Sequence, residues 1–470
     1  MMPGFMQVVA PSGAASTQTV AIPPVDPVFQ SDLNNGFRKV CFYFLLGLIF
    51  IRFSMLHQLL AYKFRVDTYV LYIFGAPCII GFLMTGGLRR LFRFKPPLYW
   101  CIFAVLIILS SAFSTWRGGS VGLVSTYLRT DFNMLFLMGG LAVGWKECRA
   151  MILTLSLSTL MSELSIRMFG QVDSNGRTNL EFGSIQNSND YAAHLILVLP
   201  FLLWAALSSK SFVYRIVALL GVAYGCYLVV ASASRGGFIA LVVSVLVTLY
   251  MGTGRQRIVG IALASLMLMV AIALVPPQAF QRILSLSENS TDASQEALMS
   301  SRIRQQLLRD SFMFAITHPL LGVGPGQFNQ NEGQSRKDSH QIGFYYEAHN
   351  SYMQVASECG IPALLCYVGG IISTLLLLKK VQRKIQGDET LTDARNALVC
   401  TRVAIIGLCT AITFVNFAFF FYLPAIAGLA AAFGGAFPEQ PAPPQQQPWP
   451  SPRKQSLAAP QFRPRTQNRA

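Results

Sequence analysis

Long apolar runs recur along most of the chain, and this repetition is the feature that most limits its fold. A helix needs about 20 apolar residues to cross a bilayer core, and the runs have close to this length. Charged residues make up only 12% of the chain, which is about half the usual share in soluble proteins. We therefore expect an all-α polytopic membrane protein with about twelve transmembrane helices. The twelve runs are residues 40–61, 68–87, 97–114, 127–144, 150–168, 189–208, 213–232, 235–252, 258–276, 352–378, 397–415 and 417–436.

The net charge of +16 is a second constraint. In a soluble protein such an excess favours nucleic-acid binding, but membrane proteins collect basic residues in their cytoplasmic loops. We therefore predict membrane lipids, and no nucleic acid, as partners. With the N-terminus inside, the basic clusters that fall in cytoplasmic loops are Arg89–Lys95, Lys146–Arg149, Lys210–Arg215, Arg255–Arg257 and Lys379–Lys384. Their agreement supports the count of twelve.

The spans divide the chain into five parts. We expect a flexible N-terminal segment (residues 1–36), nine transmembrane helices (37–276), a long outer loop (277–351), three further helices (352–436) and a disordered Pro/Gln-rich cytoplasmic tail (437–470). Loops as long as the third part are usually functional or disordered. Because this one has helical periodicity, we expect it to be folded.

Arg235 lies between two predicted spans, at the outer end of both. Positive residues are disfavoured on that side, so a functional role and a snorkelling interfacial arginine explain it equally well. A guanidinium is a planar fork that suits phosphate oxygens. Gly236 and Gly237 follow, and we expect them to form a turn and to let a ligand approach closely.

The outer loop contains a predicted amphipathic helix with three arginines. Ser300 or Ser301 is the expected N-cap, and apolar residues between positions 303 and 316 repeat at helical spacing. Arg302 and Arg309 share a face because they are seven residues apart, whereas Arg304 lies off that face. A solvated basic face is the simpler interpretation, and an anion site is the alternative.

His349 precedes a short predicted helix that ends at Gly360. Histidine is the usual general base near neutral pH, although a single histidine is more often structural. A metal site formed with His340, Asp338 and Glu347 is a further possibility. Their spacing fits no standard ligand pattern, so we predict no metal.

Asn187, Asn189 and Asp190 lie at the outer start of the sixth predicted span. Such residues are good helix caps, which is the favoured interpretation when they are taken alone. Their polar side chains could equally bind the hydroxyls of a sugar. A glycine-rich turn follows the arginine helix at residues 318–326, but no strand precedes it, so a nucleotide-binding loop is not supported.

Taken together, four motifs resemble one family. They are the segment from Asn187 to Ala192, the Ser234–Gly237 motif, the arginine helix that leads into His318–Gly326, and His349–Asn350 followed by Gly360. In this order they are similar to the bacterial O-antigen ligase and O-antigen polymerase superfamily of lipid-linked glycan transferases. The resemblance covers about residues 170–435.

The resemblance implies that a glycan is transferred from undecaprenyl pyrophosphate to an acceptor hydroxyl, in the biosynthesis of cell-surface polysaccharide. Arg235 and Arg304 match the arginines that would hold the pyrophosphate, with Arg302 as the alternative to Arg304. His349 matches the histidine that is proposed as the base. Weaker contacts to the glycan or acceptor are implied for Asn187, Asn189, Asp190 and Asn350.

The same resemblance implies a multi-pass protein of the bacterial inner membrane whose site faces the periplasm. It implies no cofactor and no metal, and the acceptor could be a glycan, a lipid or a protein. A repeat-unit polymerase is the alternative to a ligase, and Leu308 stands where a tryptophan is common in the family. The alternative from a different functional class is a polytopic transporter, but transporters hold their charges near the bilayer midplane.

Overall fold

A computed structural model describes the chain at residues 30–65, 69–173, 177–180, 183–185, 187–252, 254, 257–258, 260–261, 292–338, 340 and 345–438. Nearly all of the expected N-terminal segment, most of the predicted span at 258–276, the start of the outer loop and nearly all of the tail lie outside the described residues.

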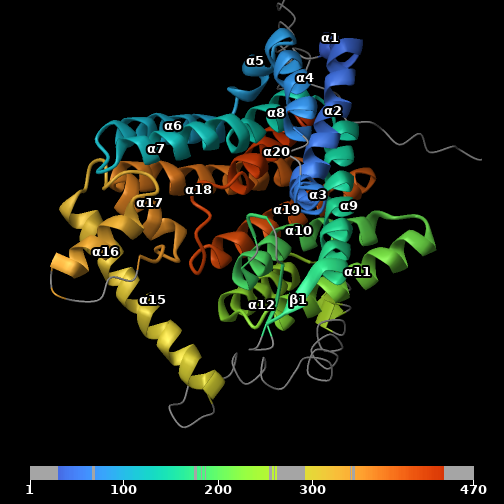
Figure 1. Cartoon of the computed structure of the whole chain (residues 1–470). Coiled ribbons are helices and arrows are strands. Elements are labelled where there is room, and N and C mark those ends of the chain that lie inside the picture. Colours follow the sequence, from blue (N-terminus) through green and yellow to red (C-terminus); the bar gives the residue numbers. More distant parts are fainter. Residues whose placement is uncertain are drawn as a thin grey trace, which may run out of the picture. The chain divides into compact units, whose positions relative to one another are not determined.

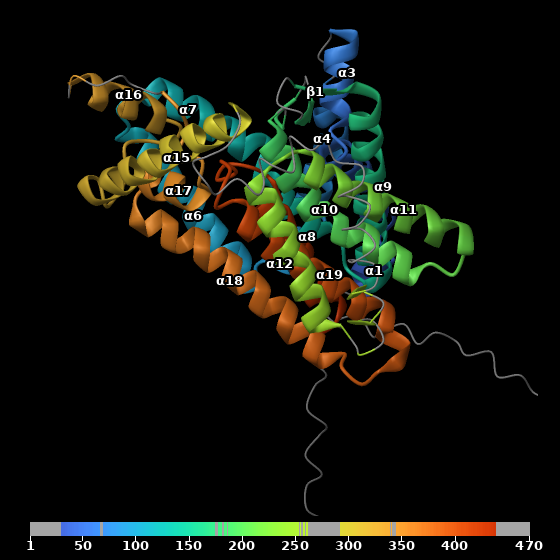
Figure 2. The same ribbon diagram turned by 90° about the horizontal axis from the view of Figure 1, so that it is seen from below.

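The described residues are mostly helical (Figures 1 and 2). The elements are α1 (Gln30–Leu33), α2 (Gly36–Phe53), α3 (Leu56–Phe64), α4 (Val70–Met84), α5 (Gly87–Leu91), α6 (Lys95–Ala112), α7 (Arg117–Thr126), η2 (Tyr127–Asp131), α8 (Asn133–Leu141), α9 (Trp145–Phe169), β1 (Gly170–Val172), β2 (Thr178–Leu180), α10 (Ser188–Ser208), α11 (Phe212–Ala231), α12 (Arg235–Met251), α15 (Asp292–Thr317), α16 (Phe328–Asp338), α17 (Ser351–Cys359), α18 (Ile361–Lys384), η3 (Glu389–Leu391), α19 (Thr392–Ala411) and α20 (Tyr422–Ala436).

Helices that could cross a membrane are present, but the expected number of about twelve is not confirmed. Within the described ranges, six helices are long and apolar enough to cross a bilayer: α6, α9, α10, α11, α18 and α19. The pair α2 and α3, bent by 65° between them, is a seventh candidate. Helices α4, α12 and α20 are apolar but shorter. The structure supports an all-α membrane protein and leaves the count of spans as a prediction.

The apolar run at 127–144 does not form one straight helix. It begins as the π-helix η2 and continues as α8, which has only nine residues. Asp131, at the end of η2, forms an ion pair of 2.5 Å with Arg52 of α2. The Arg52 guanidinium lies 4.1 Å from the centre of the Phe421 ring. This ion pair between two apolar segments is a long-range contact that a hydropathy pattern does not reveal.

Two other expected boundaries also differ. The run at 352–378 is divided at Gly360, which has a φ of +86°, into α17 and α18. The sequence predicted this short helix and its end. The loop helix α15 begins at Asp292, so Ser300 and Ser301 lie inside it and are not its N-cap.

Small residues allow the central helices to pack closely. In α20 every residue except Gly435 is buried. A Cβ added to Gly428 would lie 2.6 Å from the backbone oxygen of Leu135 in α8. Such close backbone contact is typical of helices that associate in membranes. Helix α10 lies beside α9, α11 and α19, and α18 lies along α6 (Figure 2).

Ion pairs hold together the helix ends that the sequence assigns to the inside. Arg38 of α2 pairs with Glu147 of α9 at 2.7 Å, and Arg149 of α9 pairs with Asp393 of α19 at 2.9 Å. The chain beyond the other ends of α2 and α9 also meets. Gln58 of α3, which follows α2, donates a hydrogen bond of 3.0 Å to Ser184, which follows α9 and the β1–β2 hairpin. Segments that the sequence places on one side of the membrane therefore contact one another.

The described part of the outer loop packs on the ends of α6 and α18. Helices α15, α16 and α17 lie next to each other there (Figure 1). The glycine-rich turn between α15 and α16 is held by backbone hydrogen bonds from Val323 to Ser357 and from Gly324 to Glu358, both 2.9 Å. Ser110 of α6 donates to the carbonyl oxygen of Leu321 at 2.6 Å. The described part of this loop therefore consists of helices that pack on the ends of α6 and α18.

Candidate active site

Arg235 is the first residue of α12. Ser234 caps this helix, and its hydroxyl accepts a hydrogen bond of 3.1 Å from the Gly237 amide. The chain turns at Ala233, which has a φ of +49°. The expectation that Gly236 and Gly237 make the turn is wrong, because both are helical.

The two glycines instead allow close packing. A Cβ on Gly236 would lie 2.6 Å from the side chain of Phe414, and one on Gly237 would lie 2.7 Å from the Cβ of Ala192. Arg235 itself is half-buried. Its position at the start of α12 is therefore fixed by contacts of its neighbours with α10 and with the segment that follows α19.

His349 lies two residues before the start of α17 and has a φ of +50°. Asn350 caps the helix, since its side chain accepts hydrogen bonds from the Tyr352 and Met353 amides at 3.0 and 3.1 Å. The Ser351 amide donates to the Ile412 carbonyl at 2.9 Å. His349 is thereby held in an uncommon backbone conformation, beside the segment after α19.

The electrostatic surroundings of His349 favour the neutral imidazole. Burial lowers the pKa of His349, the positive charge of Arg304 lowers it further, and Glu347 acts in the opposite sense. A general base must be unprotonated before it can accept a proton. A half-buried histidine with a lowered pKa meets this condition at neutral pH.

Arg304 is the loop arginine that faces this histidine. It is half-buried on α15, whereas Arg302 and Arg309 are exposed. The charge of Arg304 acts on His349 and also on Asp190, in the first turn of α10. Arg304, which lies off the face shared by Arg302 and Arg309, is therefore the arginine of α15 that interacts electrostatically with His349 and Asp190.

Glu347 and Asp190 complete a cluster of four ionisable groups with His349 and Arg304. The charge of Glu347 acts on both His349 and Asp190. One of its carboxylate oxygens accepts a hydrogen bond of 2.5 Å from the Asn416 side chain. The loop, α10 and the segment after α19 thus contribute to one cluster, which we call the His349 cluster.

The segment from Ile412 to Phe417 connects Arg235 to the His349 cluster. Its Phe414 packs on Gly236, next to Arg235. Its Asn416 binds Glu347 of the cluster. Through this one segment, the start of α12 and the start of α17 have a common neighbour, although more than a hundred residues separate them in the sequence.

Asn187 and Asn189 lie beside the cluster and are engaged within the protein. Asn187 caps α10, and its side-chain oxygen accepts hydrogen bonds from the amide and the side chain of Asn189, at 2.9 and 3.1 Å. The Asn189 side-chain oxygen accepts one of 3.2 Å from Arg177. The capping that the sequence favoured for this segment is confirmed.

Arg177 was not among the residues predicted from the sequence. It lies at the start of β2, and its guanidinium also donates to the Ser232 carbonyl at 3.2 Å, three residues before Arg235. The signal that singled out Arg235 was a positive residue on the side where such residues are disfavoured. The same signal, applied to the shorter outer loop, would have found Arg177.

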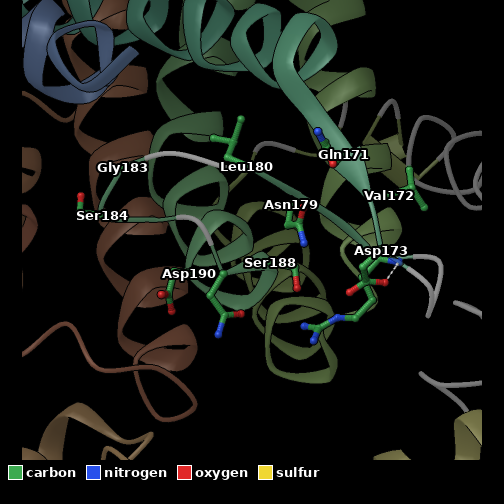
Figure 3. A pocket seen from close by; sticks show the side chains of 11 residues that line it. Gln171, Val172, Asp173, Asn179, Leu180, Gly183, Ser184, Ser188 and Asp190 are labelled. Carbon is green, nitrogen blue, oxygen red and sulfur yellow. Dashed lines mark hydrogen bonds between the residues drawn. The ribbon is translucent and has the colours of Figure 1, made fainter. Parts of the chain in front are cut away.

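A cavity of about 700 Å³ opens next to this arginine (Figure 3). The β1–β2 hairpin and the first turn of α10 form its walls. Its lining is mostly polar and consists of Gln171, Val172, Asp173, Arg177, Asn179, Leu180, Gly183, Ser184, Asn187, Ser188 and Asp190. Asp190 therefore belongs both to the cavity and to the His349 cluster.

Glu358 supports the site from within α17. It is only 3% exposed, and its carboxylate accepts hydrogen bonds from the Gly326 and Phe328 amides at 2.9 and 3.3 Å. Burial raises the pKa of Glu358 to about 8. This side chain ties the glycine-rich turn to the helix that follows His349. Over the described residues, no three His, Cys, Asp or Glu side chains come together as metal ligands would.

A family model described as O-Antigen ligase matches residues 220–368. The matched range contains Arg235, Arg302, Arg304 and His349, and it ends inside α18. No curated protein matches the chain.

Proposed function

We propose that the chain is a lipid-linked glycan ligase. The O-antigen ligase match over residues 220–368 supports this proposal, because it agrees with the resemblance to the O-antigen ligase and polymerase superfamily. The family match supports glycosyl transfer in polysaccharide biosynthesis. Our proposal adds that the enzyme moves a glycan from undecaprenyl pyrophosphate to an acceptor hydroxyl on the periplasmic face of the inner membrane. The observation that carries it is the electrostatic interaction of Arg304 with His349, within a cluster that also contains Glu347 and Asp190.

Two arginines would bind the donor. Arg235 at the start of α12 and Arg304 on α15 provide guanidinium groups for the pyrophosphate oxygens. The positive dipole ends at the amino-terminal ends of α10, α12 and α17 also favour anions. This arrangement would stabilise the pyrophosphate as negative charge develops on it in the transition state.

His349 would activate the acceptor. Its neutral imidazole takes the proton from the acceptor hydroxyl, and the hydroxyl oxygen then forms a bond to the anomeric carbon of the donor sugar. The bond between that carbon and the pyrophosphate oxygen breaks, and undecaprenyl pyrophosphate leaves with the electron pair. Four polar residues near His349 would orient the glycan or its acceptor, directly or through their neighbours. They are Asn187, Asn189, Asp190 and Asn350.

Polymerisation of repeat units uses the same chemistry with a glycan as acceptor, so it remains the alternative within the family. Ligation and polymerisation differ in the product, because a polymerase lengthens the lipid-linked glycan whereas a ligase moves it to another molecule. A transporter is disfavoured, since the candidate groups lie at helix ends and in the loop instead of near the bilayer midplane.

Substitution of the loop arginines tests the proposal. The purified protein in lipid nanodiscs is given the donor glycolipid from its host, and transfer is measured by the product's mass. Arg304→Ala should lower the rate by about a hundredfold or more, in the range seen when one transition-state donor is removed. Arg302→Ala tests the alternative assignment, and the exposed Arg309 provides the matched control Arg309→Ala. Equal loss in all three variants would contradict a specific role for Arg304.

A further inference from the structure

The cavity beside the β1–β2 hairpin presents polar groups that the fold does not use. Gln171 and Asn179 are directly opposite each other in the hairpin and both line the cavity, and opposite residues in an antiparallel pair share a face. Within the described part of the chain, neither side chain hydrogen-bonds to another group. Both residues line the cavity, and their side-chain amides can donate and accept hydrogen bonds (Figure 3).

The lining also indicates the kind of ligand. Val172 and Leu180 are its only large apolar members, while amides, hydroxyls and carboxylates form most of the wall. The acidic side chain of Asp173 offsets the charge of the single guanidinium, that of Arg177, and Asp190 adds a second acidic group. This balance disfavours an anionic ligand and suits an uncharged one with many hydroxyls. The volume of about 700 Å³ is in the usual range of small-molecule sites, about 300–1,000 Å³.

The cavity is joined to the site on two sides. Asp190 lines it and interacts electrostatically with Arg304 in the His349 cluster. Arg177 lines it and binds the Ser232 carbonyl in the turn before Arg235. A sugar attached to a pyrophosphate held by Arg235 and Arg304 would therefore lie next to this opening.

We propose that this hairpin cavity is the subsite for an uncharged sugar of the donor, recognised by Gln171 and Asn179. The inference rests on the proposed function, because it takes the donor to be a glycan on undecaprenyl pyrophosphate. Arg177 is a positioning residue, since it ties the hairpin to α10 and to the turn before Arg235. The hairpin thus selects the donor by its sugar, and the arginines bind the pyrophosphate that all donors have in common.

The test compares the binding of two lipids to the full chain in nanodiscs. One is undecaprenyl pyrophosphate alone, and the other carries a single N-acetylglucosamine, a neutral sugar with hydroxyl and amide groups. The wild type should bind the second lipid about tenfold more tightly, as two or three added hydrogen bonds would give. In the double variant Gln171→Ala and Asn179→Ala this ratio should fall to about one, with binding of the bare lipid unchanged.

Thr178→Ala is the matched control, since Thr178 precedes Asn179 in the same strand and does not line the cavity. It should keep the wild-type ratio. A ratio that the double variant does not change would overturn the subsite, as would a wild type for which the sugar adds no affinity. In both cases binding of the bare lipid would leave the proposed function intact. If the wild type bound neither lipid, the proposed function itself would fail.

Discussion

The charge of Arg304 on α15 acts directly on His349 at the start of α17 and helps to lower its pKa. The two residues belong to different helices of the outer loop, and Glu347 acts on His349 in the opposite sense. The loop therefore does more than cover a membrane bundle, because it brings a cation and an unprotonated imidazole to the same place.

This relationship predicts opposite titration shifts in two variants. Removing the positive charge in Arg304→Gln should raise the pKa of His349, and removing the negative charge in Glu347→Gln should lower it. Because the base must be neutral, the acid limb of the rate profile should move to higher pH in the first variant and to lower pH in the second. NMR titration of the His349 ring measures the shifts independently of activity. Shifts in the same direction would contradict the arrangement.

The buried carboxyl of Glu358 predicts a pH-dependent stability. Its pKa is raised to about 8 in the folded chain, against about 4.3 in an unfolded one. The folded state therefore binds the proton more tightly, and this stabilisation is lost progressively as the pH rises from about 4.3 to about 8. Thermal unfolding in nanodiscs should show a midpoint that falls over this pH range and levels off above it.

Two variants of Glu358 separate the proton effect from the hydrogen bonds. Glu358→Gln removes the titration and turns one acceptor of the Gly326 and Phe328 amides into a donor, at a cost of about 1–3 kcal/mol. Its midpoint should be lower than that of the wild type near pH 6 and should change less between pH 6 and 9. A variant with the full wild-type pH dependence would show that another group is responsible.

Close packing at the start of α12 predicts that added methyl groups will be harmful there. Gly236→Ala forces the new Cβ against Phe414, and we expect a loss of about 1–3 kcal/mol of stability, together with impaired transfer as Arg235 moves. Gly75 in α4 has no atom within 4 Å of an added Cβ, so Gly75→Ala is the control and should be tolerated. Equal effects of the two substitutions would count against this packing account.

The predicted topology places the outer loop and the loop after α18 on opposite sides of the membrane. Single cysteines at the exposed positions Gln330 and Gln386 test this with an impermeant thiol reagent applied to intact spheroplasts. The nine native cysteines are all buried or half-buried, which limits the background. We expect labelling at Gln330 and none at Gln386 until the membrane is opened. Labelling of Gln330 only from the cytoplasmic side would contradict a periplasmic site.

Local signals in the sequence predicted much of this structure. Asn187 is a cap in the structure, and the break at Gly360 follows from a residue that tolerates positive φ. Arg304 could be separated from Arg302 by helical spacing alone. These features are determined by residues that are close together in the sequence, so they can be predicted from local sequence patterns.

The rest depends on contacts between distant segments. The Arg52–Asp131 pair interrupts a run that looks like an uninterrupted span, and only the fold brings these residues together. The roles of Gly236 and Gly237 were misjudged because Phe414 and Ala192 come from other helices and loops. The hairpin cavity likewise needs β1, β2 and α10 to be folded before its lining exists.

The most direct test of the central claim is the transfer rate of His349→Ala, measured beside its affinity for undecaprenyl pyrophosphate. His318→Ala is the control, because His318 is exposed at the end of α15. The account predicts that His349→Ala transfers about 10²–10⁴-fold more slowly, the usual cost of losing a general base. It predicts that lipid binding stays within about twofold of the wild type and that His318→Ala behaves as the wild type. Transfer by His349→Ala at the wild-type rate would contradict the account.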